Sequence, residues 1–144
     1  TRGTPRKYLR AHKLQKKTDR PRTAGRMSFA LTTGQMYRRE KTVTRRLRWK
    51  RLKVGDVLVA VEKAQGLKLG ERQVPICRIR VTSIEVERLD RMITDPEYGR
   101  RECVLEGFAG LTPRLFVDMF CKANGCSSNA KVRRVEFEYV GGVR

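Results

Sequence analysis

The segment EKTVTRR, residues 40–46, follows an apolar run and leads into a strongly basic stretch of the chain. Six of the nine residues from 45 to 53 are cationic, namely Arg45, Arg46, Arg48, Lys50, Arg51 and Lys53. A lysine, two threonine hydroxyls and an arginine cluster therefore lie within a few positions of one another. Such a set can bind a polyanion, because its cations gather in one place, and it can also perform acid–base chemistry.

The overall composition favours one domain with an anionic partner. The chain has 144 residues, and its 34 Lys and Arg against 15 Asp and Glu give a formal net charge of +19. Such an excess attracts polyanions, most commonly nucleic acid or an anionic membrane. No apolar run approaches the roughly 20 residues that span a bilayer, and no secretory segment is recognisable near the start. We therefore expect a nucleic-acid partner, no membrane association and a cytoplasmic location.

Residues 1–26 differ in composition from the rest of the chain. They contain ten Lys or Arg and one acid, Asp19, but few large apolar side chains. Such a segment buries too little surface to offset the entropy lost when it becomes ordered. We predict a basic flexible arm over residues 1–26 and a folded domain over residues 27–144. Removal of the arm should weaken polyanion binding without abolishing it.

The cysteine pattern argues against a metal centre. The four cysteines are Cys77, Cys103, Cys121 and Cys126, and the single histidine is His12. The chain has no Cys-x-x-Cys pair to hold zinc, and a disulfide framework is untypical of a chain this long without an export signal. We expect reduced, partly buried cysteines, no metal and no organic cofactor.

Apolar periodicity predicts mostly strands in the first half of the folded part. The expected elements are a strand at 28–33, a turn or short helix at 34–40, a strand at 54–62 and a long strand at 74–86. Residues 54–62 are apolar on both parities, which is typical of a strand buried on both faces. In the long strand the apolar parity changes, and a bulge near Thr82 and Ser83 reconciles the two halves. The loop at 63–73 is a candidate border of any cleft.

The second half is predicted to contain helices and one closing strand. Residues 87–107 have an irregular helical pattern that Pro96 and Gly99 interrupt. A clearer helix begins after the N-cap Thr112 and stops at Asn124 and Gly125. Its expected apolar face consists of Leu115, Phe116, Met119 and Phe120. The closing strand is expected at 131–140, with Val135, Phe137 and Tyr139 pointing inward. This order of elements predicts an α+β fold in which helices cover one end of a small barrel.

Four motifs of the chain are similar, in their order and spacing, to those of a known family. They are KTVTR at 41–45, LKVGDVL at 52–58, EGF at 106–108 and a closing strand of the form Val-x-Phe-x-Tyr-Val. On these motifs, residues 27–140 resemble the ASCH domains of the PUA-like superfamily. The resemblance implies a small PUA-like β-barrel with flanking helices. One departure is that Arg39 and Glu40 stand where the family has a glycine before the Lys-Thr step.

The first functional interpretation is nucleic-acid binding, with RNA favoured, because PUA-like domains are linked to RNA binding and RNA modification. The candidate binding residues are Lys41, Arg45, Arg46, Arg48, Trp49, Lys50, Arg51 and Lys53. Their cations would contact phosphates and make affinity strongly salt-dependent. Trp49 would stack on an unpaired base, an interaction worth about 1–3 kcal/mol. The competing interpretations are a merely solvated basic face, and a Trp49 that belongs to the core or its rim.

The second interpretation is an enzyme. Some ASCH proteins resemble amidohydrolases that remove an acyl group from the exocyclic amine of cytidine, and others are described as ribonucleases. Carried over by motif, the catalytic set is Lys41, Thr44 and Glu106. A threonine hydroxyl needs a base to take its proton, a lysine of lowered pKa can be that base, and a carboxylate can pass a proton to the departing amine. Lys41 and Thr44 differ in parity, so they converge only if a turn separates them.

Each candidate catalytic residue also has a structural interpretation. Lys41 can be a surface cation. Thr44 can cap a turn or hydrogen-bond to the backbone, and Glu106 can be a charge at a helix end or an ion-pair partner of a nearby arginine. Glu102 competes with Glu106, because in a helix it would share the same face. A third functional class is a component that its basic arm tethers to a nucleic-acid-rich assembly. The pattern leaves the oligomeric state open.

Overall fold

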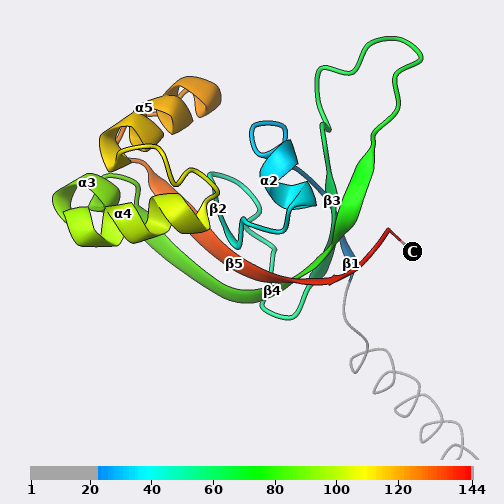
Figure 1. Ribbon diagram of the computed structural model, residues 1–144, viewed down its shortest axis with the longest axis horizontal. Helices are drawn as coiled ribbons and strands as arrows, with labels where there is room; N and C mark the ends of the chain where they lie inside the picture. Colours follow the sequence, from blue (N-terminus) through cyan, green and yellow to red (C-terminus); the bar gives the residue numbers. More distant parts are fainter. Residues whose placement is uncertain (1–22, 144) are drawn as a thin grey trace, which may run out of the picture.

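The computed structural model describes residues 23–143, in which five strands form one mixed sheet and four helices flank it (Figure 1). The strands are β1 (Thr23–Ser28), β2 (Val43–Arg46), β3 (Val57–Val61), β4 (Pro75–Arg88) and β5 (Lys131–Gly141). The helices are α2 (Thr33–Tyr37), α3 (Arg91–Thr94), α4 (Pro96–Leu105) and α5 (Pro113–Asn124). The sheet order is β1-β3-β4-β5-β2, and β1 is parallel to β3 while the other pairs are antiparallel. The predicted α+β class and the late grouping of helices are confirmed.

The prediction of a closed barrel is wrong. β1 and β2 are the two edges of the sheet, and they do not pair with each other in the part of the chain that the structure describes. The sheet nevertheless curves strongly, so that the edges approach one another (Figure 1). A side chain crosses the gap: Arg46 Nη2 donates to Ser28 O over 2.7 Å. β2 has only four residues, and its backbone pairs with β5. The contact between the two edges is therefore made by the Arg46 side chain and not by backbone hydrogen bonds.

The curvature of the sheet begins at the predicted bulge in β4. The pairing of β4 with β5 shifts register between Val81 and Ser83, as the change of parity at Thr82 and Ser83 indicated. A bulge adds one residue to a strand, bends it and increases its twist. β4 contributes side chains to the apolar cluster inside the curve, while β5 contributes Val135 and Phe137 to that cluster and Val132 to the one beneath the helices.

The first strand lies earlier in the sequence than predicted. β1 spans Thr23–Ser28, whereas the sequence predicted a strand at 28–33. Gly25 adopts φ +100 beside an irregularity in the pairing with β3, and this lets the strand extend back through a polar segment. The folded part therefore reaches back at least to Thr23, and the rest of the predicted arm, residues 1–22, lies outside the described residues.

The strand predicted at 54–62 is shorter and less buried than expected. β3 begins at Val57, and its buried residues Leu58 and Ala60 alternate with the half-buried Val57 and Val59. One face of the strand thus belongs to the core, and the other is only partly covered. The closing strand is confirmed as β5, with Val135 and Phe137 buried and Tyr139 half-buried.

The region 87–107 forms two short helices in which Pro96 and Gly99 have different roles. Pro96 begins α4, behind Asp95, whose carboxylate accepts from the backbone N–H of Tyr98. Gly99 does not break the helix. A Cβ atom at Gly99 would overlap the carbonyl oxygen of Met92 and lie 2.8 Å from Pro113 Cγ, so glycine is needed for α3 and α4 to pack closely.

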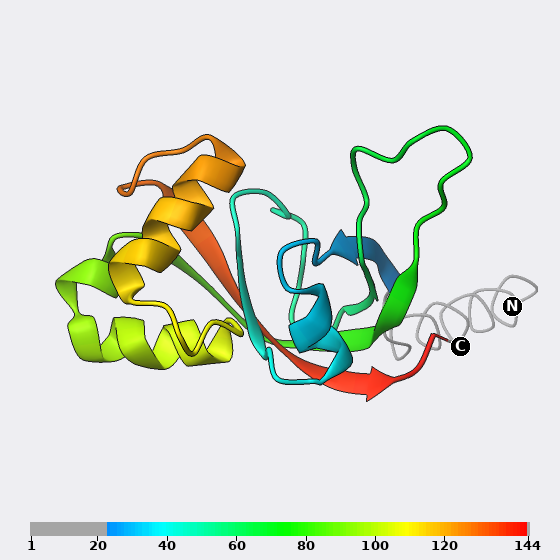
Figure 2. The ribbon, with the colours of Figure 1, turned by 45° about the horizontal axis from the view of Figure 1, so that its top comes forward.

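Helix α5 follows the prediction at both ends. Thr112 accepts a hydrogen bond from Leu115 N, and Gly125 ends the helix at φ +64. Its buried face differs in one position, because Leu115 is 53% exposed and Val117 is buried instead. Figure 2 shows α3, α4 and α5 gathered at one end of the sheet, with the β3–β4 loop protruding near the other.

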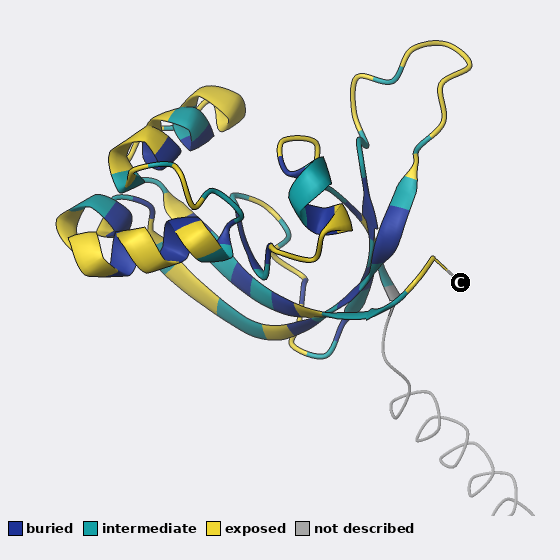
Figure 3. Cartoon of the chain, in the orientation of Figure 1, coloured by how far each residue is buried: buried dark blue, intermediate teal, exposed yellow. Residues whose placement is uncertain are grey.

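Two apolar clusters separate the molecule into a sheet end and a helical end. The first contains Met27, Met36 and Ile79 inside the curve of the sheet, and the second contains Met92 and Phe116 between the helices. Figure 3 shows that the outer sides of α4 and most of the β3–β4 loop are exposed. Among the described residues, each helix is too short or too polar to cross a lipid bilayer.

Candidate functional site

The segment that carries Lys41 is held between the end of α4 and strand β5. Thr42 N donates to Leu105 O over 2.9 Å, and Phe137 N donates to Thr42 O over 3.0 Å. On the other side, Gln35 Nε2 donates to Gly107 O. Gly107 has φ +93, and a Cβ atom there would press on Gln35 and Lys41. These contacts hold the turn at residues 106–108 against the segment that contains Lys41 and Thr42.

Docking brings Lys41 and Glu106 together in the interior. Lys41 Nζ lies 2.6 Å from Glu106 Oε1 and 2.7 Å from the Glu106 carbonyl oxygen. The two residues are 2% and 3% exposed. Burial lowers the pKa of Lys41, and the nearby carboxylate of Glu106 opposes this effect without cancelling it. The buried amine of Lys41 therefore takes up a proton less readily than the amine of a surface lysine.

Arg45 is the centre of a buried ionic network. Its guanidinium contacts the carboxylates of Glu87, Glu102 and Glu106, and its side chain has no exposed surface. It also donates to the hydroxyl of Tyr98. Burial opposes the charge of Arg45, but the three carboxylates outweigh it and raise the pKa. Arg45 was predicted to contact phosphate, and in the structure its guanidinium donates to groups inside the protein instead.

Glu102 and Glu106, the two candidates for the catalytic carboxylate, have different partners in this network. Glu102 accepts from Arg45 and from Arg134 of β5, while Glu106 accepts from Lys41 and from Arg45. Burial of Glu102 favours its neutral form, but the two guanidinium groups outweigh this and lower its pKa. Only Glu106 of these two carboxylates contacts Lys41.

Thr44 and Arg46 lie on the opposite face of β2 from Arg45. Arg46 Nε donates to Thr44 Oγ1 over 3.1 Å, and the guanidinium lies 4.9 Å from the centre of the Phe29 ring. Burial lowers the pKa of Arg46 to about 10, so the group stays cationic at neutral pH. Lys41 precedes β2, and strand alternation does not determine its direction. This is how both Lys41 and Thr44 reach the same cleft despite their different parity.

The turn before Lys41 has Arg39 and Glu40 where the motif of ASCH domains, which this segment resembles, has a glycine. Arg39 has φ +57, in the left-handed region that glycine adopts without strain. A side chain in this region costs roughly 1–2 kcal/mol. The Arg39 guanidinium lies over the ring of Tyr139, 5.5 Å from its centre, and Tyr139 in turn donates to Lys41 O. These contacts hold the turn in place.

A cleft of about 720 Å³ opens between the helical end and the sheet end, and Lys41, Thr44 and Glu106 line it. Further cationic residues from separate segments also line it, namely Arg26, Arg45, Arg46, Arg48 and Lys63. Its aromatic lining consists of Phe29, Trp49, Phe108, Phe116 and Phe120. The cleft therefore places cations, aromatic rings and a buried Lys–Glu pair in one continuous space.

Comparison with known proteins supports the fold. No protein-family model matches the sequence, and a search of the curated proteins finds no match. Among solved structures, the hypothetical protein PH0355 aligns with a TM-score of 0.54 at 14% identity, over 81% of this chain and 98% of its own. Protein EF3133 from Enterococcus faecalis V583, described with the family model DUF984, aligns at 0.52 and 15% identity, over 94% and 92% of the two chains.

An ASCH domain from Lactobacillus crispatus JV V101 aligns at 0.49 and 16% identity, over 81% of this chain and 79% of its own. The alignments with PH0355 and EF3133 show that this chain shares their fold. The four sequence motifs resemble those of ASCH domains. At these levels of identity the likeness extends to fold and not to activity.

The eight predicted binding residues divide into two groups. The cleft is lined by Lys41, Arg45, Arg46, Arg48 and Trp49, while the exposed Lys50, Arg51 and Lys53 lie outside its lining. The predicted loop 63–73 contributes Lys63, Ala64 and Gln65. Sequence reasoning missed Arg26 and the phenylalanines of the lining, because no local pattern connects residues from five different segments.

Proposed function

We propose that the chain binds RNA through the cleft, with phosphates at its rim and an unpaired base inside. The observation that carries this proposal is the presence of cations and aromatic rings in one cleft. Cations supply affinity for the backbone, and rings stack on bases of any sequence. A duplex hides its bases, so single-stranded or looped RNA fits better than a helix.

The conformation of Trp49 supports this assignment. Trp49 has φ +71, which is unusual for a bulky residue, and its side chain is half-buried against the sheet-end cluster while lining the cleft. Leu52 N donates to Trp49 O and holds the turn. A strained backbone conformation persists where the surroundings enforce it, often at a functional site. A ring fixed in this way stacks on a base without losing further side-chain entropy.

Salt-dependent RNA binding tests the proposal. Fluorescence anisotropy would compare a labelled single-stranded RNA with a duplex across a series of salt concentrations. We expect the double variant Arg48→Ala/Lys63→Ala to reduce the salt slope by about 1 to 2, since each lost phosphate contact to a single strand removes about 0.7. The Trp49→Ala variant should weaken binding without changing the slope.

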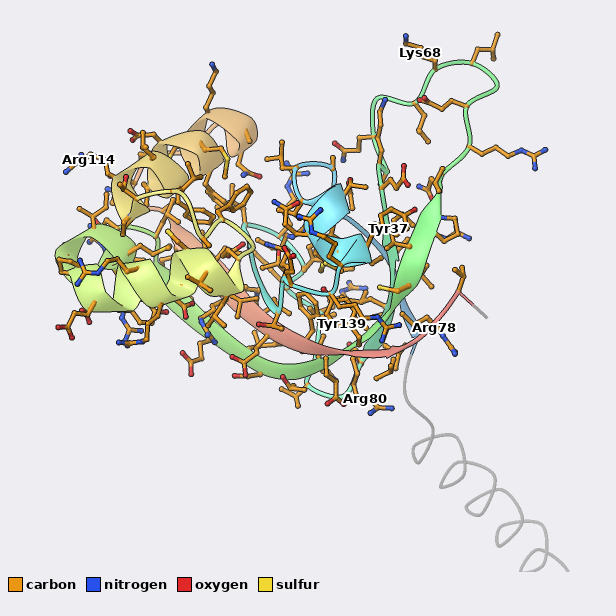
Figure 4. All side chains as sticks on the ribbon, in the orientation of Figure 1. Tyr37, Lys68, Arg78, Arg80, Arg114 and Tyr139 are labelled. Carbon is orange, nitrogen blue, oxygen red and sulfur yellow. The ribbon has the colours of Figure 1, made fainter. Side chains whose placement is uncertain are left out.

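The matched control is Arg114→Ala/Lys122→Ala, which removes the same charge from exposed positions of α5 outside the cleft lining. Arg114 lies on the side of α5 turned away from α2 (Figure 4). If the two double variants change the salt slope equally, RNA binding depends only on the overall charge, and the assignment to the cleft is overturned.

A second candidate function is hydrolysis of an acyl group on the exocyclic amine of cytidine. The contact between Lys41 and Glu106, which both line the cleft, favours it. Thr44 Oγ1 would attack the acyl carbonyl while Lys41 in its neutral form takes the hydroxyl proton, and this proton would pass through Glu106 to the departing amine. Water would then hydrolyse the acyl-threonine ester, which releases the acid and restores the Thr44 hydroxyl. In the structure Lys41 donates to Glu106 and Thr44 accepts from Arg46, so substrate binding must first bring Lys41 and Thr44 together.

Turnover of N4-acetylcytidine tests this second function. We expect release of acetate by the purified chain, and loss of release in Lys41→Met, Thr44→Val and Glu106→Gln. Glu85→Gln, which changes an exposed carboxylate, is the control. No turnover beside intact RNA binding would leave a binding domain, and cleavage of the labelled RNA would instead indicate a ribonuclease. Tethering through the basic arm concerns residues 1–22, outside the described part.

A further inference from the structure

Two cysteines lie side by side where α5 ends. Cys126 Sγ lies 3.9 Å from Cys121 Sγ, and both side chains are half-buried. A disulfide has its sulfurs about 2.05 Å apart, so small rotations of the two side chains would bring them to bonding distance. Neither residue lines the cleft or belongs to the ionic network, and the proposed function uses neither.

The backbone holds this pair in place. Gly125, at φ +64, donates from N to Cys121 O over 2.8 Å, and Cys126 N donates to the same oxygen over 3.2 Å. This is the C-terminal capping turn in which the residue after the glycine folds back on the last turn of the helix. Such turns usually bring two apolar side chains into contact. Here they bring together two thiols, which can react with each other.

We propose that Cys121 and Cys126 are a reversible disulfide site that is oxidised by exchange with a small-molecule disulfide such as oxidised glutathione. A thiolate of the pair attacks the glutathione disulfide, which breaks its S–S bond and releases one glutathione thiolate. The second cysteine thiolate then attacks the protein sulfur of the mixed disulfide and releases the second. The two cysteines lose two electrons and two protons, and two glutathione thiols carry them.

The other two cysteines do not compete for this reaction. Cys77 is 4% exposed in the sheet-end cluster, and Cys103 is 1% exposed in the helical cluster. A buried thiol offers little access to an attacking disulfide. The pair at the end of α5 is more accessible and has an internal partner at contact distance. Oxidation is therefore selective for two of the four thiols.

The reaction would fix one wall of the cleft. Phe120, Ala123 and Asn124 line the cleft and flank Cys121 in the last turn of α5. A covalent link from Cys121 to Cys126 closes this turn and opposes its fraying. The C-terminal end of a helix carries partial negative charge, and burial raises the pKa of Cys121, so exchange accelerates as the pH rises.

Peptide mapping after redox equilibration tests the proposal. The full chain would be equilibrated with mixtures of reduced and oxidised glutathione, quenched with acid, alkylated while unfolded and cut with trypsin. Cleavage after Lys122 separates the peptide 115–122, which holds Cys121, from the peptide 123–131, which holds Cys126. The two peptides stay joined only if the disulfide is present. We expect this linked pair, its disappearance on reduction, and alkylated Cys77 and Cys103.

The variant Cys126→Ser separates a disulfide site from unspecific oxidation. It keeps the other three thiols, and we expect it to give no linked peptides at any glutathione ratio. The proposal is overturned if all four cysteines of the unsubstituted chain are alkylated in oxidised glutathione. It is equally overturned if Cys121 and Cys126 each retain a separate glutathione adduct, or if the linked peptides contain Cys77 or Cys103.

Discussion

Lys41 and Glu106 lie 65 positions apart in the sequence, and their side chains meet in the lining of the cleft with Nζ 2.6 Å from Oε1. The second carboxylate oxygen of Glu106 accepts from Arg45 over 3.0 Å. One carboxylate thus balances two buried cations. Its loss would affect both the stability of the fold and the charge state of the lysine.

The variant Glu106→Gln should lower the free energy of unfolding by about 3–5 kcal/mol, because it leaves the buried Lys41 without its anionic partner. Urea unfolding monitored by circular dichroism measures the change. The matched control is Glu138→Gln, which breaks the exposed pair with Arg80 and should change the free energy by less than about 1 kcal/mol. Equal effects in the two variants would mean that the buried pair does not stabilise the fold.

The ionisation of Lys41 should occur at lower pH than that of a surface lysine. Burial lowers the pKa of Lys41 below the ordinary value of about 10.4. Heteronuclear NMR of the side-chain nitrogen, followed across alkaline pH, measures the midpoint. In Glu106→Gln the midpoint should fall further, because Glu106 favours the charged form. If Lys41 is the base for deacylation, the rate should rise with pH through the same midpoint. An upward shift in the variant would contradict the proposed electrostatics.

Glu102 should make the fold sensitive to acid. Its pKa is lowered in the folded state, so its contribution to stability is fully present above the pKa of the unfolded state, about 4.3. The contribution is lost as the pH falls through the lower, folded pKa. Urea midpoints from pH 7 to about pH 3 measure the effect. Glu102→Gln should be less stable at pH 7, and its stability should depend less on acid pH. A parallel pH profile would refute the assignment.

Gly99→Ala should destabilise the helical end by about 1–3 kcal/mol or more, since the added methyl group overlaps Met92 O and crowds Pro113. Gly110→Ala is the control, because a Cβ atom at Gly110 meets nothing within 4 Å. Thermal unfolding of both variants measures the difference. If Gly99→Ala is as stable as the control, then α3 and α4 do not need to pack so closely.

Several features follow from residues close together in the sequence. The cap at Thr112, the stop at Gly125 and the bulge after Val81 were all predicted, because a few neighbouring residues determine their backbone geometry. The alternation of Val135 and Phe137 likewise identified the inner face of β5. The errors lie where packing between distant segments decides the outcome. Gly99, for example, was predicted to break a helix. Its role in close packing depends on the carbonyl oxygen of Met92, which belongs to a different helix and forms no local pattern with Gly99.

The sequence alone determined the α+β class and the order of the elements apart from β2, which was not predicted. The candidates Lys41, Thr44 and Glu106 came from the resemblance to ASCH domains. Tertiary structure decided that the sheet stays open with Arg46 across its gap, and that Arg45 is buried among three carboxylates. It also decided which cations surround the cleft. The physical reason is that hydrogen bonds along a strand or helix depend on near neighbours. The burial and pairing of a charge depend on which distant segments the fold places beside it.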